Sequence, residues 1–340
     1  MDYLPEISLP SDPRTRQGSA ALAALNQACF QDAAVVMLPD DEAYDAREEA
    51  KALARKEAAE NNYGADPGSD EYSDEEEEGG GEGKNRRFRA AATMPEGALH
   101  VQLLFASSGK PKAAYPRALV KCGRGNALKL TQTYCTLPAP GAASAADPSS
   151  TSSSSTTSFT DGLTRVVCGE GSRVAHEYVQ DTAAATKGPA FYDAVSVACA
   201  KSTDHSIVAF GLGGASSRVN YECVIGGENA RTSLECVLLS DSRQSMDLHS
   251  SITHAAPNSQ SFQEHRNLVA DRSECIFKGR IRVDQVAQGT NSNQLCKSLL
   301  LSDNARVTIM PSMEIIADQV LGCLFSLHRK GDTGCMEVVR

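Results

Sequence analysis

A short polar turn followed by a strand of alternating apolar residues recurs along this chain, and this recurrence limits the fold more than any other feature. The clearest copies occupy 120–130, 167–174, 212–219, 225–231 and 301–307. After Ala194 almost no helical periodicity is present. Short strands without helices to cover a sheet need an all-β architecture that closes on itself, such as a sandwich, a barrel or a β-solenoid. The repeated turn favours the solenoid, because each coil can bury its apolar side against its neighbours.

Two low-complexity segments interrupt this pattern. Residues 41–96 carry 17 acidic and 8 basic side chains, which accounts for most of the formal net charge of −10. Residues 41–60 could form a solvated helix, but the segment as a whole is predicted to be a disordered acidic insertion. Residues 138–158, rich in Ser and Ala, predict a flexible loop between strands. The predicted organisation is an N-terminal segment (1–40), the insertion (41–96), a strand-rich core (97–320) and a tail (321–340).

Charge and hydropathy exclude several classes of partner. Outside the insertion the chain is nearly neutral, so no basic surface for nucleic acid is predicted. No apolar run approaches 18 residues, so no membrane-spanning helix is predicted. Residues 1–17 have neither the basic start and apolar core of a secretory signal nor the Arg- and Ser-rich composition of a transit peptide.

The 11 cysteines do not form a metal-binding or redox motif at the level of sequence. No two of them are separated by only two residues, so neither a zinc ribbon nor a thioredoxin-type dithiol is indicated. An odd number of cysteines without a signal peptide indicates reduced thiols. Cys199, Cys223 and Cys236 lie within apolar strand-like runs, where we expect them to act as small buried hydrophobes.

A series of short motifs between 240 and 320 is more specific. The order is D-L-H at 247–249, S-F-Q-E-H-R-N-L-V at 261–269, F-K-G-R-I-R-V at 277–283, A-Q-G-T-N-S-N-Q at 287–294, L-L-L-S at 299–302 and M-E-I-I-A-D at 313–318. In this order they resemble the core of the SufB/SufD family of iron–sulfur cluster assembly proteins. The H-x-Y-x-Q element at 176–180 resembles SufD more than SufB.

The resemblance implies a fold and a set of partners. It implies a right-handed parallel β-helix, the SufBD core, acting as a non-catalytic subunit of the SUF scaffold. The implied partners are a SufB-type paralogue and a SufC-type ATPase. It further implies an iron–sulfur cluster held transiently at a subunit interface, and a plastid location in a eukaryote or a cytoplasmic one otherwise. This chain contains no phosphate-gripping G-x-x-x-x-G-K-[ST] loop, so we expect it not to hydrolyse ATP and to bind no nucleotide. That it is no enzyme is what the resemblance implies.

The sequence departs from the family after Val320. The family continues with a Cys-x-His element, further strands and a helical domain that contacts the ATPase, whereas Gly322 and Leu324 occupy the corresponding Cys and His positions here. Cys323 and His328 are suitable ligand types at a different spacing, and they are the candidate metal ligands together with Cys335. The tail reads as truncated or divergent, so we expect weakened contact with the SufC-type ATPase.

Other residues could be read as sites. His249, His254 and His265 are further candidate ligands, but His249 and His254 would face opposite sides if one strand holds both. Asp247, His249 and Ser250 could be read as a hydrolase triad, but no G-x-S-x-G element accompanies them. The cluster at 211–214 is read as a turn between coils. The alternatives to the scaffold role are a β-helix carbohydrate-active enzyme, which needs paired carboxylates, and a non-functional fragment of a SufD-like protein.

Overall fold

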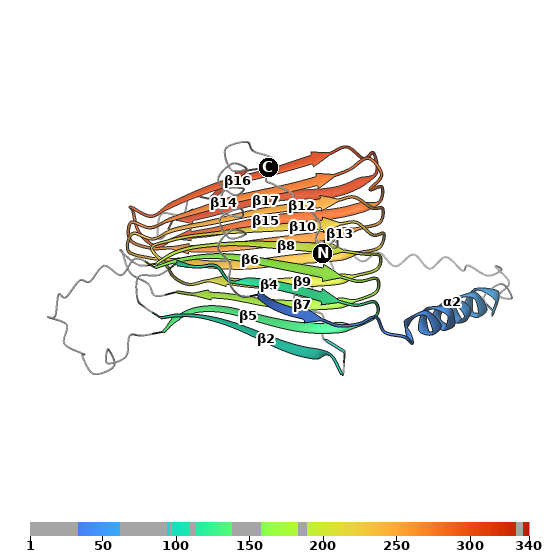
Figure 1. The fold of residues 1–340 in the computed structure, drawn as a ribbon. Helices are drawn as coiled ribbons and strands as arrows, with labels where there is room; N and C mark the ends of the chain where they lie inside the picture. Colours follow the sequence, from blue (N-terminus) through green and yellow to red (C-terminus); the bar gives the residue numbers. More distant parts are fainter. Residues whose placement is uncertain are drawn as a thin grey trace, which may run out of the picture.

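The computed structural model describes residues 33–61, 94–95, 97–108, 113–137, 158–182, 189–330 and 336–339. Within these ranges the chain winds into a solenoid whose strands alternate between two nine-stranded sheets (Figure 1). Every strand pairing is parallel except the last, between β17 and β18. The predicted all-β fold and parallel β-helix are therefore confirmed.

The two sheets take alternate strands along the chain. Sheet A contains β1 (Ala33–Met37), β3 (Ala113–Ala114), β4 (Arg117–Cys122), β6 (Phe159–Cys168), β8 (Ala190–Cys199), β10 (Ser216–Ile225), β12 (Ser245–His254), β14 (Glu274–Val283) and β16 (Arg306–Ile315). Sheet B contains β2 (Leu99–Ser108), β5 (Ala127–Leu137), β7 (Arg173–Asp181), β9 (Asp204–Gly211), β11 (Arg231–Ser240), β13 (Gln260–Val269), β15 (Thr290–Leu300), β17 (Val320–Lys330) and β18 (Met336–Val339).

The turn that leads from sheet A to sheet B explains why the coils stack in register. In each of six coils one turn residue has a positive φ: Gly125, Gly171, Ser202, Asn229, Asn258 and Gly289. Its N–H donates to a carbonyl of the next coil, for example from Gly171 to Lys201 at 2.9 Å and from Asn229 to Pro257 at 3.2 Å. Gly and Asn tolerate this left-handed conformation best, and this is the physical basis of the repeated turn seen in the sequence.

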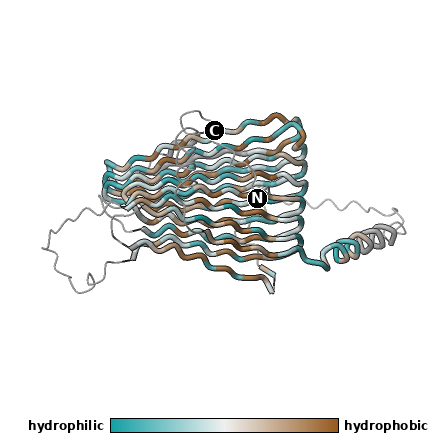
Figure 2. The backbone as a smooth tube through the Cα atoms, in the orientation of Figure 1, coloured by the Kyte–Doolittle hydropathy of each residue, from teal (hydrophilic) through white to brown (hydrophobic). Residues whose placement is uncertain are grey.

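Alternate side chains of both sheets meet inside the solenoid. In β14, for example, every second residue is buried, including Phe277 and Ile281. The hydropathy colouring shows the same alternation along most strands (Figure 2). The interior also contains polar side chains, among them four histidines that are at most 1% exposed: His176, His205, His254 and His265. The core is thus mixed, with neutral polar groups embedded among aliphatic ones.

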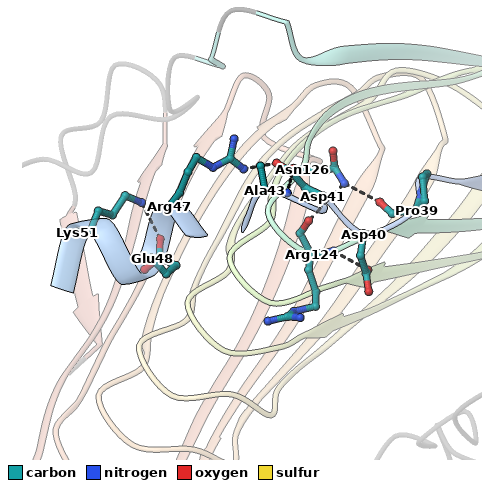
Figure 3. A network of polar contacts seen from close by, with 9 residues as sticks. All are labelled: Pro39, Asp40, Asp41, Ala43, Arg47, Glu48, Lys51, Arg124 and Asn126. Carbon is teal, nitrogen blue, oxygen red and sulfur yellow. Dashed lines mark hydrogen bonds and ion pairs between the residues drawn. The ribbon is translucent and has the colours of Figure 1, made fainter. Parts of the chain in front are cut away.

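One helix departs from the solenoid. Residues 44–61, within the segment predicted to be disordered, form α2 (Tyr44–Asn61), which projects beyond the turn between the two sheets (Figure 1). Asp41 caps its start, accepting the N–H of Ala43 at 3.0 Å and pairing with Arg47 (Figure 3). Asp40 accepts the N–H of Arg124 at 2.9 Å. In the described residues no helix is long and apolar enough to cross a membrane.

The core boundaries differ from those expected. β1 precedes the predicted core but pairs with β4 in sheet A, and β17 follows it but pairs with β15 residue by residue. The solenoid therefore includes the end of the predicted N-terminal segment and the first half of the predicted tail. The predicted loop at 138–158 lies between β5 and β6, and its residues 138–157 fall outside the described ranges, as do 62–93 of the predicted insertion.

Candidate functional site

The last coil leaves one strand edge open. β16 pairs with β14 on one side and with no described strand on the other. The N–H of Arg306 donates to the carbonyl of Ser273, the residue before β14, at 3.0 Å, and the N–H of Ile316 donates to Val283, the last residue of β14, at 2.9 Å. The even-numbered positions of β16 therefore face β14, and the odd-numbered positions face the open edge. One of these positions is Pro311, which has no N–H. Met310 and Ile315 are each 45% exposed beside this edge.

The candidate ligands Cys323 and His328 both lie on β17 but at different register positions. Cys323 pairs with Asn293 and His328 pairs with Ser298. Ser298 belongs to the buried set of β15, whereas Asn293 belongs to the half-buried outer set. Positions five apart on a strand lie on opposite faces. The strand therefore does not bring the two residues together, and Cys335 lies outside the described residues.

The cysteines of the solenoid core are poor metal ligands as they stand. Of the eight cysteines between 122 and 296, seven are buried, and none of the eight forms a disulfide. Burial raises the pKa of Cys122 and Cys275 to about 11 and that of Cys296 to about 12. A thiol that stays protonated is a weak nucleophile and ligand. The expected hydrophobic role of Cys199, Cys223 and Cys236 is confirmed, since each is at most 3% exposed.

The closest thiol pair is Cys199 and Cys223, whose sulfur atoms lie 3.9 Å apart. Cys122, Cys168 and Cys199 also occupy matching positions on three successive strands of sheet A. Among the described residues, however, no group of three or more His, Cys, Asp or Glu side chains is arranged to hold a metal ion. The thiols therefore form a packed column within the core.

The three other candidate histidines have separate environments. His254 is buried and bonds Ser259 through Nδ1 at 2.7 Å and Ser261 through Nε2 at 2.9 Å. His249, on the same strand, lies on the outer face, where its Nε2 is 2.8 Å from Asp247 Oδ1. They lie on opposite faces, as predicted. His265 is buried against the ring of Phe277, with centroids 3.9 Å apart. Burial lowers the pKa of His254 to about 4 and of His265 to about 3.

The hydrolase triad is excluded by strand alternation. Ser250 is 3% exposed and its hydroxyl donates to Gln263 Oε1 inside the solenoid at 2.7 Å. His249 lies on the other face of the same strand. Asp247 is held by Arg218, whose Nε donates to its Oδ2 at 2.7 Å. These outer side chains form a structural ion-pair cluster in which the nucleophile is absent.

Two buried carboxyl groups lie at adjacent register positions of neighbouring strands, which the sequence did not predict. Asp161 on β6 and Asp193 on β8 are both fully buried. Tyr178 donates to Asp193 Oδ2 at 2.9 Å, and Arg117 acts electrostatically on Asp161. Burial, then the charge of Asp193, raises the pKa of Asp161 to about 7, and burial raises that of Asp193 to about 6. A polysaccharide cannot reach carboxyl groups that are fully buried, so Asp161 and Asp193 do not support the carbohydrate-enzyme alternative.

The glycine cluster at 211–214 is a tight turn. A Cβ at Gly213 would lie 1.7 Å from the carbonyl oxygen of Thr182, and Gly214 has a φ of +86°. Gln180 Nε2 donates to the carbonyl of Gly213 at 2.9 Å. The space that a phosphate would need is filled by a neighbouring chain segment, in agreement with the predicted turn.

Comparison with known proteins identifies the pattern as a whole. The family model for "SUF system FeS cluster assembly, SufBD core domain" matches residues 105–324, which are 220 of the 340 residues. The chain is 32% identical over 163 residues to the protein ABCI7, chloroplastic, of Arabidopsis thaliana. It is 28% identical over 163 residues to an iron–sulfur cluster assembly SufBD family protein of Synechocystis sp.. It is 26% identical over 166 residues to the iron–sulfur cluster assembly protein SufD of Plasmodium falciparum.

These alignments differ in how much of each protein they cover. They include 48% of this chain for the first two relatives and 49% for the third. The same alignments cover 34%, 35% and 11% of the full lengths of the respective relatives. The chain therefore spans about a third or less of the length of these curated relatives.

Proposed function

The chain belongs to the SufB/SufD family of iron–sulfur cluster assembly proteins, and from this premise we propose that it is a non-catalytic scaffold subunit of a SUF complex. In this role it pairs with a SufB-type paralogue, and an iron–sulfur cluster is assembled between the two subunits and then passed on. The cluster is cargo of the complex. The name of the Arabidopsis relative, which includes the word chloroplastic, supports a plastid location if the source is eukaryotic.

The observation that carries this proposal is the open edge of β16 at the end of a rigid parallel solenoid. An unpaired strand edge is a ready template for a strand from another chain, and the partner's strand would satisfy its free backbone groups. Met310 and Ile315 supply exposed apolar surface beside that edge. A partner with a matching strand edge would therefore contact both the free backbone groups of β16 and these exposed side chains.

We propose that Cys323 and His328 act singly, because their register positions separate them on β17. A transient cluster at a subunit interface needs only one or two ligands from each chain, with the remainder supplied by the partner. A thiolate is the stronger ligand for iron–sulfur clusters, and histidine is a harder substitute. We further propose a SufC-type ATPase as the other partner in this complex.

The test is capture of purified SufB-type and SufC-type subunits by this chain under anaerobic, reducing conditions. We expect retention of the SufB-type subunit, and retention of the SufC-type subunit is measured in parallel. Met310→Asp and Ile315→Asp should each reduce that retention at least tenfold, because a buried charge opposes edge pairing. Val286→Asp is the matched control, since Val286 is 64% exposed but lies in a turn.

Two results would contradict the proposal. The first is failure of the folded wild-type chain to retain the SufB-type subunit. The second is an equal loss of retention in all three Asp variants, which would place the contact elsewhere. Cluster formation in the captured pair is then followed by visible absorbance in Cys323→Ser and His328→Ala, each compared with Cys135→Ser. If neither variant lowers the absorbance, the ligand roles of Cys323 and His328 are wrong.

A further inference from the structure

The first coil of the solenoid leaves a layer of core side chains incompletely covered. β1 pairs only with β4 and β2 only with β5 among the described strands. Their inward side chains pack on the main core but stay half-buried: Val36, Leu38, Val101, Leu103 and Phe105. The adjoining layer, with Val120, Leu128 and Leu130, is fully buried. The core is therefore apolar up to an open end, and its last layer is half-exposed.

The same two strands expose further apolar side chains. Val35 is 57% exposed, Met37 63%, Leu99 49% and Leu104 67%. Both strands also have one free backbone edge. An open apolar end with free edges favours association, and natural solenoids cover such ends with capping segments. This end lies opposite the β16 edge in the strand order of sheet A.

The sequence immediately before β1 is uncharged and partly apolar, a composition suited to packing against an apolar surface. Residues 19–31 contain no Asp, Glu, Lys or Arg, in contrast to the heavily charged 41–96. Their larger apolar residues, Leu22, Leu25, Cys29 and Phe30, recur at i, i+3, i+7 and i+8, the spacing of one helical face. The remaining positions are Ala, Ser, Asn and Gln. Such a segment offers one apolar side and no charge to desolvate.

We propose that residues 19–31 of this chain cover the open first coil, with Leu22, Leu25, Cys29 and Phe30 against the layer formed by Val36, Val101, Leu103 and Phe105. Only Gln31 and Asp32 separate Phe30 from the first residue of β1. A tether this short gives the segment an effective concentration beside the opening that a second molecule cannot match at ordinary protein concentrations. This proposal concerns the end remote from the β16 edge, so it stands independently of the scaffold role.

The first measurement needs no substitution, because Cys29 reports on the contact. We expect alkylation of Cys29, followed by mass spectrometry, to be at least tenfold slower in the native chain than in the urea-unfolded chain. The rate should rise toward the unfolded value in the double variant Leu22→Glu/Leu25→Glu. It should stay slow in Ala24→Glu/Gln27→Glu, which adds the same charge on the opposite helical face. Alkylation of native Cys29 at the unfolded rate would overturn the proposal.

A second measurement distinguishes this segment from a second copy of the chain. Leu103→Cys places a thiol in the half-exposed layer, and mild oxidation should join it to Cys29 within one molecule. Hydrogen exchange of Val101 and Phe105 should be equally slow at low and high protein concentration. A disulfide formed mainly between two molecules, or protection that appears only as the chain dimerises, would show that a second copy occupies this end instead.

Discussion

Tyr44 lies across Gly171 so closely that a Cβ on this glycine would be 2.2 Å from the Tyr44 hydroxyl oxygen. A Cβ added to Gly125 in the preceding coil would lie 2.5 Å from the same ring, at Tyr44 Cδ2. Arg124 lies 5.3 Å from the ring centroid and pairs with Asp45 at 2.7 Å. The helix α2 is therefore fixed to the solenoid at its first turn by one aromatic side chain that fits only where two successive turns lack a side chain.

Gly171→Ala is expected to destabilise the fold by about 2–3 kcal/mol, because it combines a positive φ with a collision against Tyr44. Gly97→Ala is the control for the backbone part alone, since Gly97 has a φ of +87° and no atom within 4 Å of an added Cβ. It should cost about 1 kcal/mol. Urea unfolding measures both. Equal losses would mean that the fit against Tyr44 contributes nothing.

Asp161→Asn is expected to stabilise the protein at pH 8 by roughly 2–4 kcal/mol and to change little at pH 4. Burial and Asp193 raise the pKa of Asp161 from 3.8 to about 7, although Arg117 opposes the shift. The folded state therefore favours the protonated carboxyl, and this contribution is lost as the pH rises from 3.8 through 7. Asparagine cannot ionise, so it avoids that loss. The check is thermal unfolding between pH 4 and 8, with the exposed Asp181→Asn as control. A stability difference that does not change with pH would contradict the assignment.

Acid is expected to unfold the chain as pH falls from about 6.5 toward 4. Burial lowers the pKa of His176 and His265 to about 3 and of His205 and His254 to about 4, from 6.5. The unfolded chain binds these protons first, so the stability present above pH 6.5 is lost through this window. Asp161 and Asp193 act in the opposite direction, but four histidines outweigh two carboxyls.

Two leucine variants separate proton binding from hydrogen bonding in this acid response. His265→Leu removes one proton site, and neither His265 ring nitrogen has a hydrogen-bond partner among the described residues. It should therefore raise stability at pH 5. His254→Leu also removes a site, but it additionally removes the hydrogen bonds of His254 with Ser259 and Ser261, and it should cost about 1–3 kcal/mol at pH 7. The same effect of both substitutions at both pH values would refute this account of the core.

Pro311→Val is expected to make the β16 edge pair more readily with a strand of another molecule, because it restores a backbone N–H that faces the open side. The variant should dimerise at several-fold lower concentration than the wild-type chain, as measured by light scattering. Pro257→Val, in a turn, provides the comparison. If the Pro311 variant stays monomeric to the same concentration as both other proteins, Pro311 does not limit pairing at this edge.

The parts of the fold that sequence could predict are those that each coil encodes locally. Turn residues with positive φ, such as Gly171 and Asn229, occur in the repeated motif, and alternation correctly placed His249 and His254 on opposite faces. The proximity of Asp161 to Asp193 could not be predicted in this way, because it follows from the parallel register of β6 and β8, which places Asp161 opposite Tyr192 and Asp193 opposite Gly162.

Other features were missed because their signals are weak or shared. The inward position of His176 and Gln180 was hidden, since polar residues in an alternating strand usually face solvent. The docking of α2 depends on a single residue, Tyr44, in an otherwise charged helix. The second half of β17 lies beyond residue 324, where the family match ends, and the place of this strand is set by its pairing with β15. No local pattern distinguishes such a strand from a loose tail.

The two sheets do not terminate alike. In sheet B the strand β18 runs antiparallel along Ser326–Arg329 of β17, whereas β16 in sheet A has no counterpart. A parallel sheet can be extended strand by strand only while each added strand runs in the same direction as the one before it. At this end of the solenoid, β18 interrupts the parallel pattern in sheet B, whereas β16 continues it in sheet A. Among the described strands, the edge that another parallel strand can extend here is therefore the edge of sheet A alone.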